Sequence, residues 1–513
     1  MLIGSFVFQK KKEKKQMWDK IIEAIDKGNS FLNNIVWGWP AIVMILGTGL
    51  LLSIMTRFLQ VRYFGTSLKT TIIPTLKSIG KKQQKNTDKN TVTPFEAFSA
   101  AISGTVGTGN IIGVTSAILT GGPGAVFWMW VSAFFGMVTN YSENVLGLYY
   151  RKRNKDGSFS GGAFHYLDRG LHLKWLGYIA AVFCLVAAIG MSGVQTNKIV
   201  DTISSVAGND NIAFKLVLGA VVATFVALII VGGIKRIGKV TSMLVPFMSL
   251  LFIVLALILI IINVKEVPGA FAKIFTTAFN FKAAGGGIMG YAFATVIRKG
   301  MARGVFSNEA GLGSSVIAHS ASQTKEPVVQ GLWGVFEVFF DTFVICTFTA
   351  LAVLTSPLFA GFTGLENDTA TSIAVFANTF GGFGKGCFAV ILPLFAFTTI
   401  IAWSYYGEKA TEFCFQKLGE KGQKAAVLGF KIIYVVLIVA SALIESELIW
   451  GISDTANGLM ALPNLIAVVL LSGVVVKITK NYFARQKGEK IEPMLSDYPE
   501  LNEEFKKEIE EQK

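Results

Sequence analysis

The segment 104–110, Gly-Thr-Val-Gly-Thr-Gly-Asn, has residue types and a spacing that could bind a ligand. Its three glycines weaken a helix, yet it lies within an uncharged run, 97–142. In lipid, every backbone N–H and C=O that a broken helix frees must find another partner. A half-helix that begins at such a break favours a carboxylate, and one that ends there presents carbonyl oxygens that suit a cation. We therefore expect a site for both groups, although close packing between helices would use the same small residues.

A second segment, 304–310, has similar features in the other half of the chain. A shift of 200 residues pairs Gly104 with Gly304 and Gly113 with Gly313, and a proline then opens the next span in each half, Pro123 and Pro327. In a glycine-rich chain the identities alone carry little weight, but five predicted spans separate the two segments, which makes the second copy inverted. We expect discontinuous helices near 103–110 and 303–311, the arrangement that alternating access requires.

The composition defines the class of protein that positions these segments. Of 513 residues, 52% are hydrophobic and 16% are charged, whereas soluble domains carry about 25% charged residues. This excludes a soluble enzyme and a nucleic-acid binder. The four cysteines have no metal-ligand spacing, and no catalytic or nucleotide-binding motif lies in the apolar spans, so we expect neither an enzyme nor an organic cofactor.

Apolar windows long enough to cross a bilayer recur along the chain. The clear ones are 28–56, 97–142 (two spans that break at 121–124), 175–197, 216–234, 240–264, 342–365, 386–407 and 455–476, and weaker ones lie at 284–318 and 425–444. With turns placed at glycine, proline and charged clusters, we count eleven spans, the first apart from the other ten. The predicted fold class is an all-α polytopic membrane protein.

These spans divide the chain into five parts. We expect an N-terminal extension with an interfacial amphipathic helix (1–34), an additional first transmembrane helix (35–57), a first five-helix repeat (95–264), an inverted second five-helix repeat (284–476) and a cytoplasmic tail (477–513). Residues 1–16 lack a small-residue cleavage site, and we interpret them as an upstream start before Met17 rather than a targeting signal.

The orientation follows from the positive charges of the connections. The segments 57–94 and 151–174 are rich in lysine and arginine and should face the cytoplasm. Lysine-rich segments at 408–431 and 477–489 occur where alternation of the spans requires inside connections. With an odd number of spans, the N-terminus lies outside and the C-terminus lies in the cytoplasm.

Four longer motifs resemble a known family. They are FEAFSAAISGTVGTGNIIGV (95–114), GGPGAVFWMW (121–130), DGSFSGGAFHYLDRGL (156–171) and RGVFSNEAGLGSS (303–315). These motifs closely resemble the alanine or glycine:cation symporter family of bacteria and archaea. The resemblance implies a carrier for a small neutral amino acid with co-transported sodium, in the cell membrane, with a leucine-transporter-like fold of five plus five inverted helices and one preceding helix.

The first motif is also similar to the unwound first core helix of neurotransmitter:sodium symporters. By that resemblance, the amides of Thr108 and Gly109 would bind the substrate carboxylate, and the Thr105 carbonyl would face its amino group. The same resemblance implies a sodium site from two carbonyls and two hydroxyls. The residues that match are Ser103, Val106, Thr398 and Thr399. A threonine in such a helix can instead bond its own backbone.

The remaining substrate contacts that we expect lie on both breaks and on two other spans. The full set is Thr105, Gly107, Thr108, Gly109, Asn110, Gln195, Phe306, Ser307, Asn308 and Trp403. Gln195 interrupts an apolar span with a side chain that can hydrogen-bond to substrate. Trp403 could form an aromatic wall that limits side-chain size, or could belong to an interfacial belt.

Charged residues at membrane depth are candidates for function because their burial is costly. We expect Arg303 and Glu309 to pair, with Arg298 and Lys299 nearby, as structural or gating ion pairs. Glu337 and Asp341 share a helix face, and we interpret them in the same way. Glu143 and Asp454 should lie near span ends, and His165, His172 and His319 in or near loops.

Two classes of function compete. The first is a monomeric secondary symporter that imports alanine or glycine with sodium, with the amino acid and the lipid bilayer as partners and no nucleic acid. The second is a channel, which needs no paired inverted breaks. A proton-coupled carrier is the nearer alternative, but it would need a titratable group where this sequence has Thr398 and Thr399.

Overall fold

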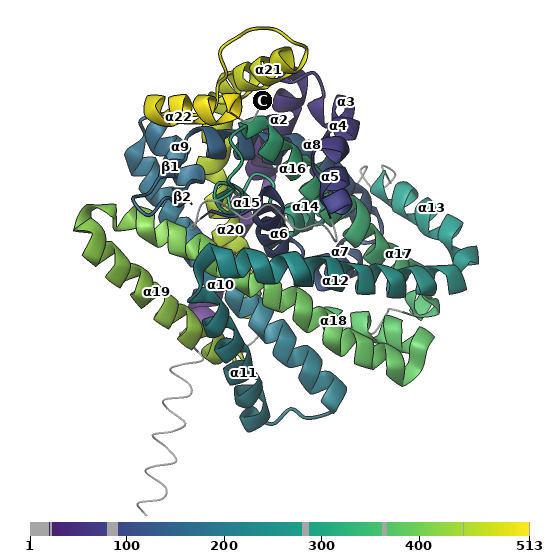
Figure 1. Ribbon diagram of the computed structural model, residues 1–513. Helices are drawn as coiled ribbons and strands as arrows, with labels where there is room; N and C mark the ends of the chain where they lie inside the picture. The colour runs from purple at the N-terminus through teal and green to yellow at the C-terminus, as the bar shows by residue number, and fades with distance from the viewer. Residues whose placement is uncertain are drawn as a thin grey trace, which may run out of the picture.

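The computed structural model describes residues 20, 23–78, 91–279, 287–361, 367–444 and 446–511. These residues form helices joined by short connections, with a single two-stranded hairpin in the described part (Figure 1). The predicted all-α class is confirmed. Our interpretation of residues 1–16 lies outside the described residues.

The N-terminal part is a helix that precedes the segments predicted as two repeats. Residues 23–36 are helical and, after a turn at Trp37 and Gly38, the chain continues as α2 (Trp39–Met55). Three short helices follow, α3 (Leu59–Arg62), α4 (Phe64–Thr70) and α5 (Ile72–Ser78). The amphipathic helix predicted within residues 1–34 is described only in part, and its described residues from 23 on belong to the helix that leads into α2.

The first half contains the predicted break. Its elements are α6 (Pro94–Thr105), η1 (Thr108–Asn110), α7 (Ile112–Gly121), α8 (Gly124–Tyr149), β1 (Lys152–Arg153), β2 (Phe159–Ser160), α9 (Ala163–Arg169), α10 (Lys174–Ala207), α11 (Ile212–Ile230) and α12 (Gly233–Ile262). A capping box between Thr93 and Glu96 starts α6. The predicted turn at 121–124 is confirmed, and Gly122 adopts φ +76° there, which favours glycine.

The second half runs from α13 to α22. Its elements are η2 (Val264–Glu266), α13 (Val267–Ala278), α14 (Gly287–Asn308), α15 (Ser315–His319), α16 (Pro327–Val338), η4 (Phe339–Cys346), α17 (Thr347–Thr355), η5 (Pro357–Gly361), α18 (Asp368–Cys414), η6 (Gln416–Leu418), α19 (Gly419–Ser441), α20 (Ser446–Leu470), α21 (Ser472–Gln486) and α22 (Pro499–Glu510). The predicted span at 342–365 is wrong in its bounds, because the helical run extends over Pro327–Thr355. The carboxylates of Glu337 and Asp341 lie within this run and form hydrogen bonds with buried polar residues, so they do not end the span.

Helices of both halves pack against each other in two groups. In one, α8 packs against α14 and α16, and in the other α10 packs against α18 and α20. Large apolar side chains such as Val231 and Met243 project from α11 and α12, with exposed fractions of 77% and 70%. By length and composition, eight described helices could cross a membrane, or nine if the bent pair α6 and α7 counts as one span.

Close contact between α8 and α14 depends on Gly300. A Cβ added there would collide with the Ala125 carbonyl oxygen and lie 2.7 Å from the Cβ of Trp128. We expect Gly300→Ala to lower the stability by about 1–3 kcal/mol through overpacking. In Gly429→Ala, which meets no atom within 4 Å, the thermal unfolding midpoint in detergent should stay at its original value. Equal midpoints for the two variants would contradict this account of the contact.

Candidate functional site

The first break has the unwound geometry that its glycines predict. α6 ends at Thr105, the helices on either side of the break differ in direction by 57°, and Gly107 is extended with φ −130° and ψ −152°. The Asn110 side-chain oxygen accepts a hydrogen bond from the Gly107 amide at 2.9 Å. This bond fixes the turn between the two half-helices.

Gln195 of α10 reaches this break, as the sequence predicts. Its side-chain oxygen accepts a hydrogen bond of 3.2 Å from the Thr108 amide. A Cβ added at Gly107 would lie 3.3 Å from the Gln195 nitrogen and 2.5 Å from the Thr399 hydroxyl, so both side chains pack against bare backbone. The Thr108 hydroxyl is buried and has no hydrogen-bond partner, which leaves a polar atom available to a ligand at the break.

The predicted ion-binding residues meet in part. Thr399 of α18 donates hydrogen bonds to the Ser103 carbonyl at 2.9 Å and to the Phe395 carbonyl at 3.1 Å. Thr398 donates to Phe395 at 2.9 Å and to the Met248 sulfur of α12 at 3.6 Å. Thr399 therefore faces the break, and Thr398 faces α12. Val106, the residue after α6, is fully buried beside them.

The second break begins later than predicted. Residues 303–308 are helical, and the chain unwinds over 309–314, where Glu309, Gly311 and Gly313 have φ of 55°, 92° and 73°. Glu143 of α8 accepts hydrogen bonds from the amides of Gly311 at 3.3 Å and Gly313 at 3.1 Å. Our placement of Glu143 near a span end is wrong, because this carboxylate is needed inside the bundle to satisfy the unwound backbone.

Asp341 joins the first break to the last turn of α14, just before the second break. Its carboxylate accepts hydrogen bonds from Asn110 at 2.5 Å, Ser307 at 2.8 Å and the Thr342 hydroxyl at 2.8 Å. Asn308 donates to the Thr342 hydroxyl at 3.2 Å. Asp341 lies in η4, a π-helical stretch, and such stretches are frequent at functional sites.

The expected ion pairs differ from those in the structure. Glu337 binds His319 at 2.7 Å, and the other nitrogen of that ring meets Gln330 at 2.7 Å. Glu337 and Asp341 thus serve separate networks. His319 ends α15 and is fully buried, because its two hydrogen bonds satisfy both ring nitrogens.

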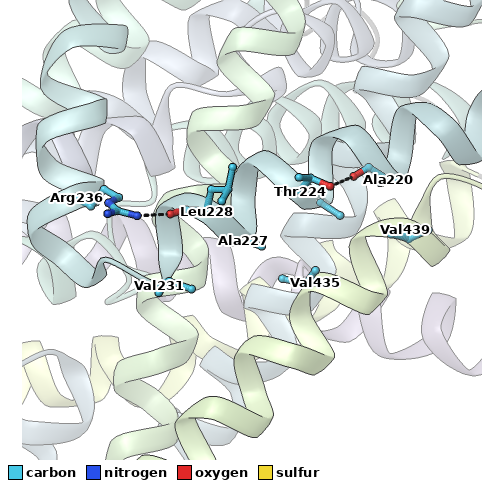
Figure 2. Close-up of a pocket in the computed structure, with 9 residues that line it drawn as sticks. Ala220, Thr224, Ala227, Leu228, Val231, Arg236, Val435 and Val439 are labelled. Atoms are coloured by element: carbon cyan, nitrogen blue, oxygen red, sulfur yellow. Dashed lines mark hydrogen bonds between the residues drawn. The ribbon is translucent and has the colours of Figure 1, made fainter.

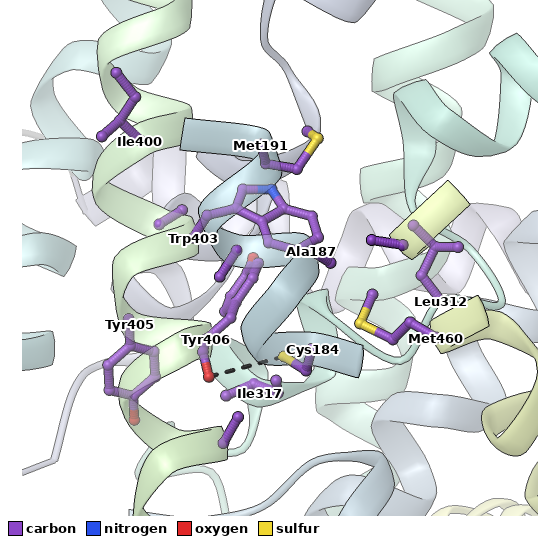
Figure 3. Packing of buried hydrophobic residues seen from close by; sticks show 14 of the residues in the cluster. Cys184, Ala187, Met191, Leu312, Ile317, Ile400, Trp403, Tyr405, Tyr406 and Met460 are labelled. Atoms are coloured by element: carbon purple, nitrogen blue, oxygen red, sulfur yellow. Dashed lines mark hydrogen bonds between the residues drawn. The ribbon is translucent and has the colours of Figure 1, made fainter. Parts of the chain in front are cut away.

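Glu309 binds Trp403 instead of Arg303. The Trp403 ring nitrogen donates to the Glu309 carboxylate at 2.9 Å, and Arg303 pairs with Asp454 at 3.2 Å. Trp403 and Tyr406 of α18 lie beside Ala187 and Met191 of α10 (Figure 3). Because Trp403 is 0% exposed, it is not part of an interfacial belt.

Aromatic rings cover the site at one end. Phe306 would contact a Cβ on Gly109 at 3.3 Å and stacks on Trp450 with 5.4 Å between ring centroids. The Arg303 guanidinium lies over both rings, at 5.6 Å and 5.1 Å. No predicted site side chain is more than 3% exposed, so the structure shows a closed site.

The site can offer negative charge as well as neutral oxygens. Among the described residues, the carboxylates of Glu143, Glu309 and Asp341 have no lysine or arginine partner within salt-bridge distance. A buried carboxylate is costly unless a cation or a proton neutralises it. Our sequence analysis placed none of the three at the site. Asn140, Glu143 and Asn144, polar residues on adjacent turns of an apolar span, were a usable signal for Glu143.

A pocket elsewhere in the molecule is unrelated to these residues. It lies between α11 and α19, has a volume of about 560 Å³, and Arg236 donates to the Leu228 carbonyl at its edge (Figure 2). Most of its lining side chains are alanine, valine or leucine. These alanine, valine and leucine side chains provide no group that could bind a polar substrate.

Comparison with known proteins identifies relatives of this chain. Residues 22–496 match the model of the sodium:alanine symporter family. The chain is 41% identical over 464 residues to the sodium/alanine symporter AgcS of Methanococcus maripaludis, covering 89% of this chain and 97% of that protein. From Bacillus subtilis, the putative sodium/proton-dependent alanine carrier protein YrbD is 37% identical (90% and 93% covered) and the probable sodium/glutamine symporter GlnT is 34% identical (89% and 91% covered).

Solved structures establish the fold. MhsT in complex with L-phenylalanine superposes with a TM-score of 0.54 at 14% identity, covering 78% of this chain and 99% of that one. At this identity the likeness concerns the fold alone. The similarity to leucine-transporter-like folds that the sequence motifs imply is therefore confirmed, and the division into five plus five inverted helices stays a prediction.

We expect Asp341 to stabilise the protein as a hydrogen-bond acceptor. Asp341→Ala leaves three buried donors without it, whereas Asp341→Asn keeps one acceptor oxygen. We expect the alanine variant to be less stable than the asparagine variant by about 1–3 kcal/mol, the cost of an unsatisfied buried polar group. Thermal unfolding in detergent measures the difference, with Glu420→Ala, at an exposed ion pair, as the neutral control. An alanine variant as stable as the asparagine variant would show that Asp341 does not hold the breaks together.

Proposed function

This chain belongs to the sodium:alanine symporter family, and we propose that it imports a small neutral amino acid, alanine or glycine, together with sodium. As a member it is a sodium-coupled amino-acid transporter and not an enzyme. The substrates named for relatives differ, including alanine and glutamine. The choice of a small substrate therefore depends on the site of this chain.

The observation that carries the proposal is the polar backbone at the first break. The amide of Thr108 already donates to an acceptor oxygen, that of Gln195, at 3.2 Å, and the Thr108 hydroxyl is unpartnered. We propose that a substrate carboxylate takes the position of the Gln195 oxygen, with Gly107 and Gly109 allowing its close approach. The Thr105 carbonyl would then accept the substrate ammonium group.

The size of the substrate follows from the residues around this backbone. Phe306 lies against Gly109, and Trp403, held by Glu309, forms a second aromatic wall. Ser307 and Asn308 are engaged with η4 and line the second break. Large aromatic side chains on two sides leave room for a hydrogen atom or a methyl group, and each further methylene would cost about 1–3 kcal/mol.

Sodium would bind next to the substrate, between α6 and α18. The Thr399 hydroxyl lies 2.9 Å from the Ser103 carbonyl, so two oxygens of the proposed set are already adjacent. Val106 would add a second carbonyl and Thr398 a second hydroxyl, after its side chain turns from α12. Sodium is a hard cation that prefers such oxygen ligands.

We further propose eleven spans, with the N-terminus outside and the C-terminus in the cytoplasm of a bacterial or archaeal cell, and a monomer as the working unit. α8 and α14, which have 26 and 22 residues, would complete the count beyond the nine by length and composition. The lysine and arginine of the 151–174 connection support the orientation.

Proton coupling is the second candidate, and Asp341 favours it. Thr398 and Thr399 cannot titrate, but a buried carboxylate that touches both breaks could bind a proton or a cation. A relative is named as a sodium/proton-dependent alanine carrier. A channel has no comparable support, because the closed site is lined by two inverted breaks.

Uptake of radiolabelled alanine into proteoliposomes tests the proposed function. We expect an inward sodium gradient to drive accumulation and an inward proton gradient at zero sodium to drive none, because the proposed cation ligands are neutral oxygens. Empty liposomes give the background. Accumulation that depends on the proton gradient alone would replace sodium by the proton as the coupling ion. Uptake of glutamine in preference to alanine would refute the small pocket.

Thr399→Val tests the ion site without changing side-chain volume. Loss of one oxygen ligand should raise the sodium concentration for half-maximal uptake by roughly tenfold or more, since a hydrogen-bond-like contact to a charge contributes about 1.5–3 kcal/mol. Thr355→Val is the matched control, because Thr355 is buried and bonds only the Leu351 carbonyl at 2.7 Å. If both variants kept the original sodium dependence, sodium would not bind at Thr399.

A further inference from the structure

The C-terminal segment, predicted as a charged tail, is folded onto the rest of the chain. α21 and α22 lie at the same end of the molecule, and α22 is close to α9 and the β-hairpin (Figure 1). Leu501 and Phe505 of α22 form a buried cluster with Leu495 and with Phe159 of β2. We call residues 495–510 the tail. Its apolar face gives it a defined docking position.

Ion pairs connect the tail to loops of both halves. In the first half, Glu504 pairs with Arg153 and Asp497 pairs with Arg169 at 2.7 Å. In the second half, Glu508 pairs with Lys325 at 2.5 Å. The tail thus bridges the loop after α8, the helix α9, and the loop that precedes α16.

The loop 320–326, which lies beneath the tail, is itself connected to α6, the helix that ends at the first break. Arg151, fully buried, donates to the carbonyls of Ser320 at 3.1 Å and Ser322 at 2.6 Å, and its guanidinium lies 3.9 Å from the Phe159 ring. Val92, just before α6, donates to the Ala321 carbonyl at 3.3 Å. A movement of this loop therefore affects the start of the helix that contains the first break.

Two of the elements that the tail pairs with, α9 and the 320–326 loop, belong to the two different helix groups of the fold. α9 packs on α10, whereas the 320–326 loop leads into α16, which packs on α8. If the two groups separate at this end, the tail cannot keep its ion pairs to both. Contacts that exist in only one of two states shift the equilibrium toward that state.

We propose that the tail is a clamp that holds the cytoplasmic side of the carrier closed and must detach from one half before that side opens. The proposal rests on the proposed orientation and on alternating access. The clamp consists of partly exposed ion pairs at the surface, which are individually weak, so it biases the closed state and can still be released in each cycle. Together with the Phe306–Trp450 cover, the clamp would leave the site closed at both ends.

Cysteine labelling in nanodiscs, where both faces are accessible, tests the clamp. One reporter is Ser322→Cys beneath the tail, and a second is Ser99→Cys, one turn from Ser103 on α6. Both serines are at most 1% exposed. The half-buried Cys387 and Cys414 are changed to serine, and Cys184 and Cys346 are buried. The probe is a membrane-impermeant maleimide.

The test compares each reporter protein with a variant in which one residue of an ion pair has the opposite charge. Arg153→Glu should raise the labelling rates of both reporters by roughly two- to tenfold, the range that a few weak ion pairs support. Adding Glu504→Arg should restore slow labelling, because the pair re-forms with opposite signs. Lys506→Ala is the control, since Lys506 pairs only with Glu492 and Glu503 in the same C-terminal segment and should not alter either rate.

The outcomes separate a clamp from a simple cover. Faster labelling at Ser322→Cys alone would show that the tail merely shields the loop, and it would overturn the proposal, as would failure of the charge swap to restore slow labelling. Labelling needs no transport. Clamp-sensitive labelling in a protein that accumulates no alanine would therefore refute the proposed function and leave the conformational clamp standing.

Discussion

The structure depends on one constraint, that every backbone polar group freed by a break in an apolar environment must find a partner. The two breaks meet it differently. At the first, Asn110 and Gln195 accept the amides of Gly107 and Thr108. At the second, Glu143 accepts two glycine amides. The first break is satisfied by neutral, exchangeable groups that a substrate can replace, whereas the second is held by a charged carboxylate and is more rigid.

Buried charge follows from the same constraint. Asp341 receives donors from the first break and from the end of α14, so the acceptor that joins the halves also brings a negative charge into the site. Glu309 similarly orients Trp403. A low-dielectric interior makes such groups expensive without a counter-charge. Buried carboxylates of this kind require a cation or a proton to neutralise them.

Closure at the two ends uses different interactions. On one side, Phe306 and Trp450 stack beneath Arg303, a compact arrangement next to the site. On the other, the tail spans loops that lie far apart in the sequence and holds them by ion pairs. Aromatic packing excludes water near the ligand, whereas weak ion pairs between large bodies can be broken at small cost.

The sequence by itself determined the helical class, the first break, the turn at 121–124 and the family, because apolar run length and glycine spacing are local properties. It also placed Gln195 at the break, since this residue interrupts an apolar span, and the family resemblance placed Thr399 there. Only the tertiary structure decided which residue each charge meets. Arg303 pairs with Asp454 and not Glu309, and Glu143 lies inside the bundle, because partners more than 100 residues apart are chosen by packing between helices and not by neighbours on one helix. The same holds for the docked tail, whose charge pattern alone resembles that of a solvated segment.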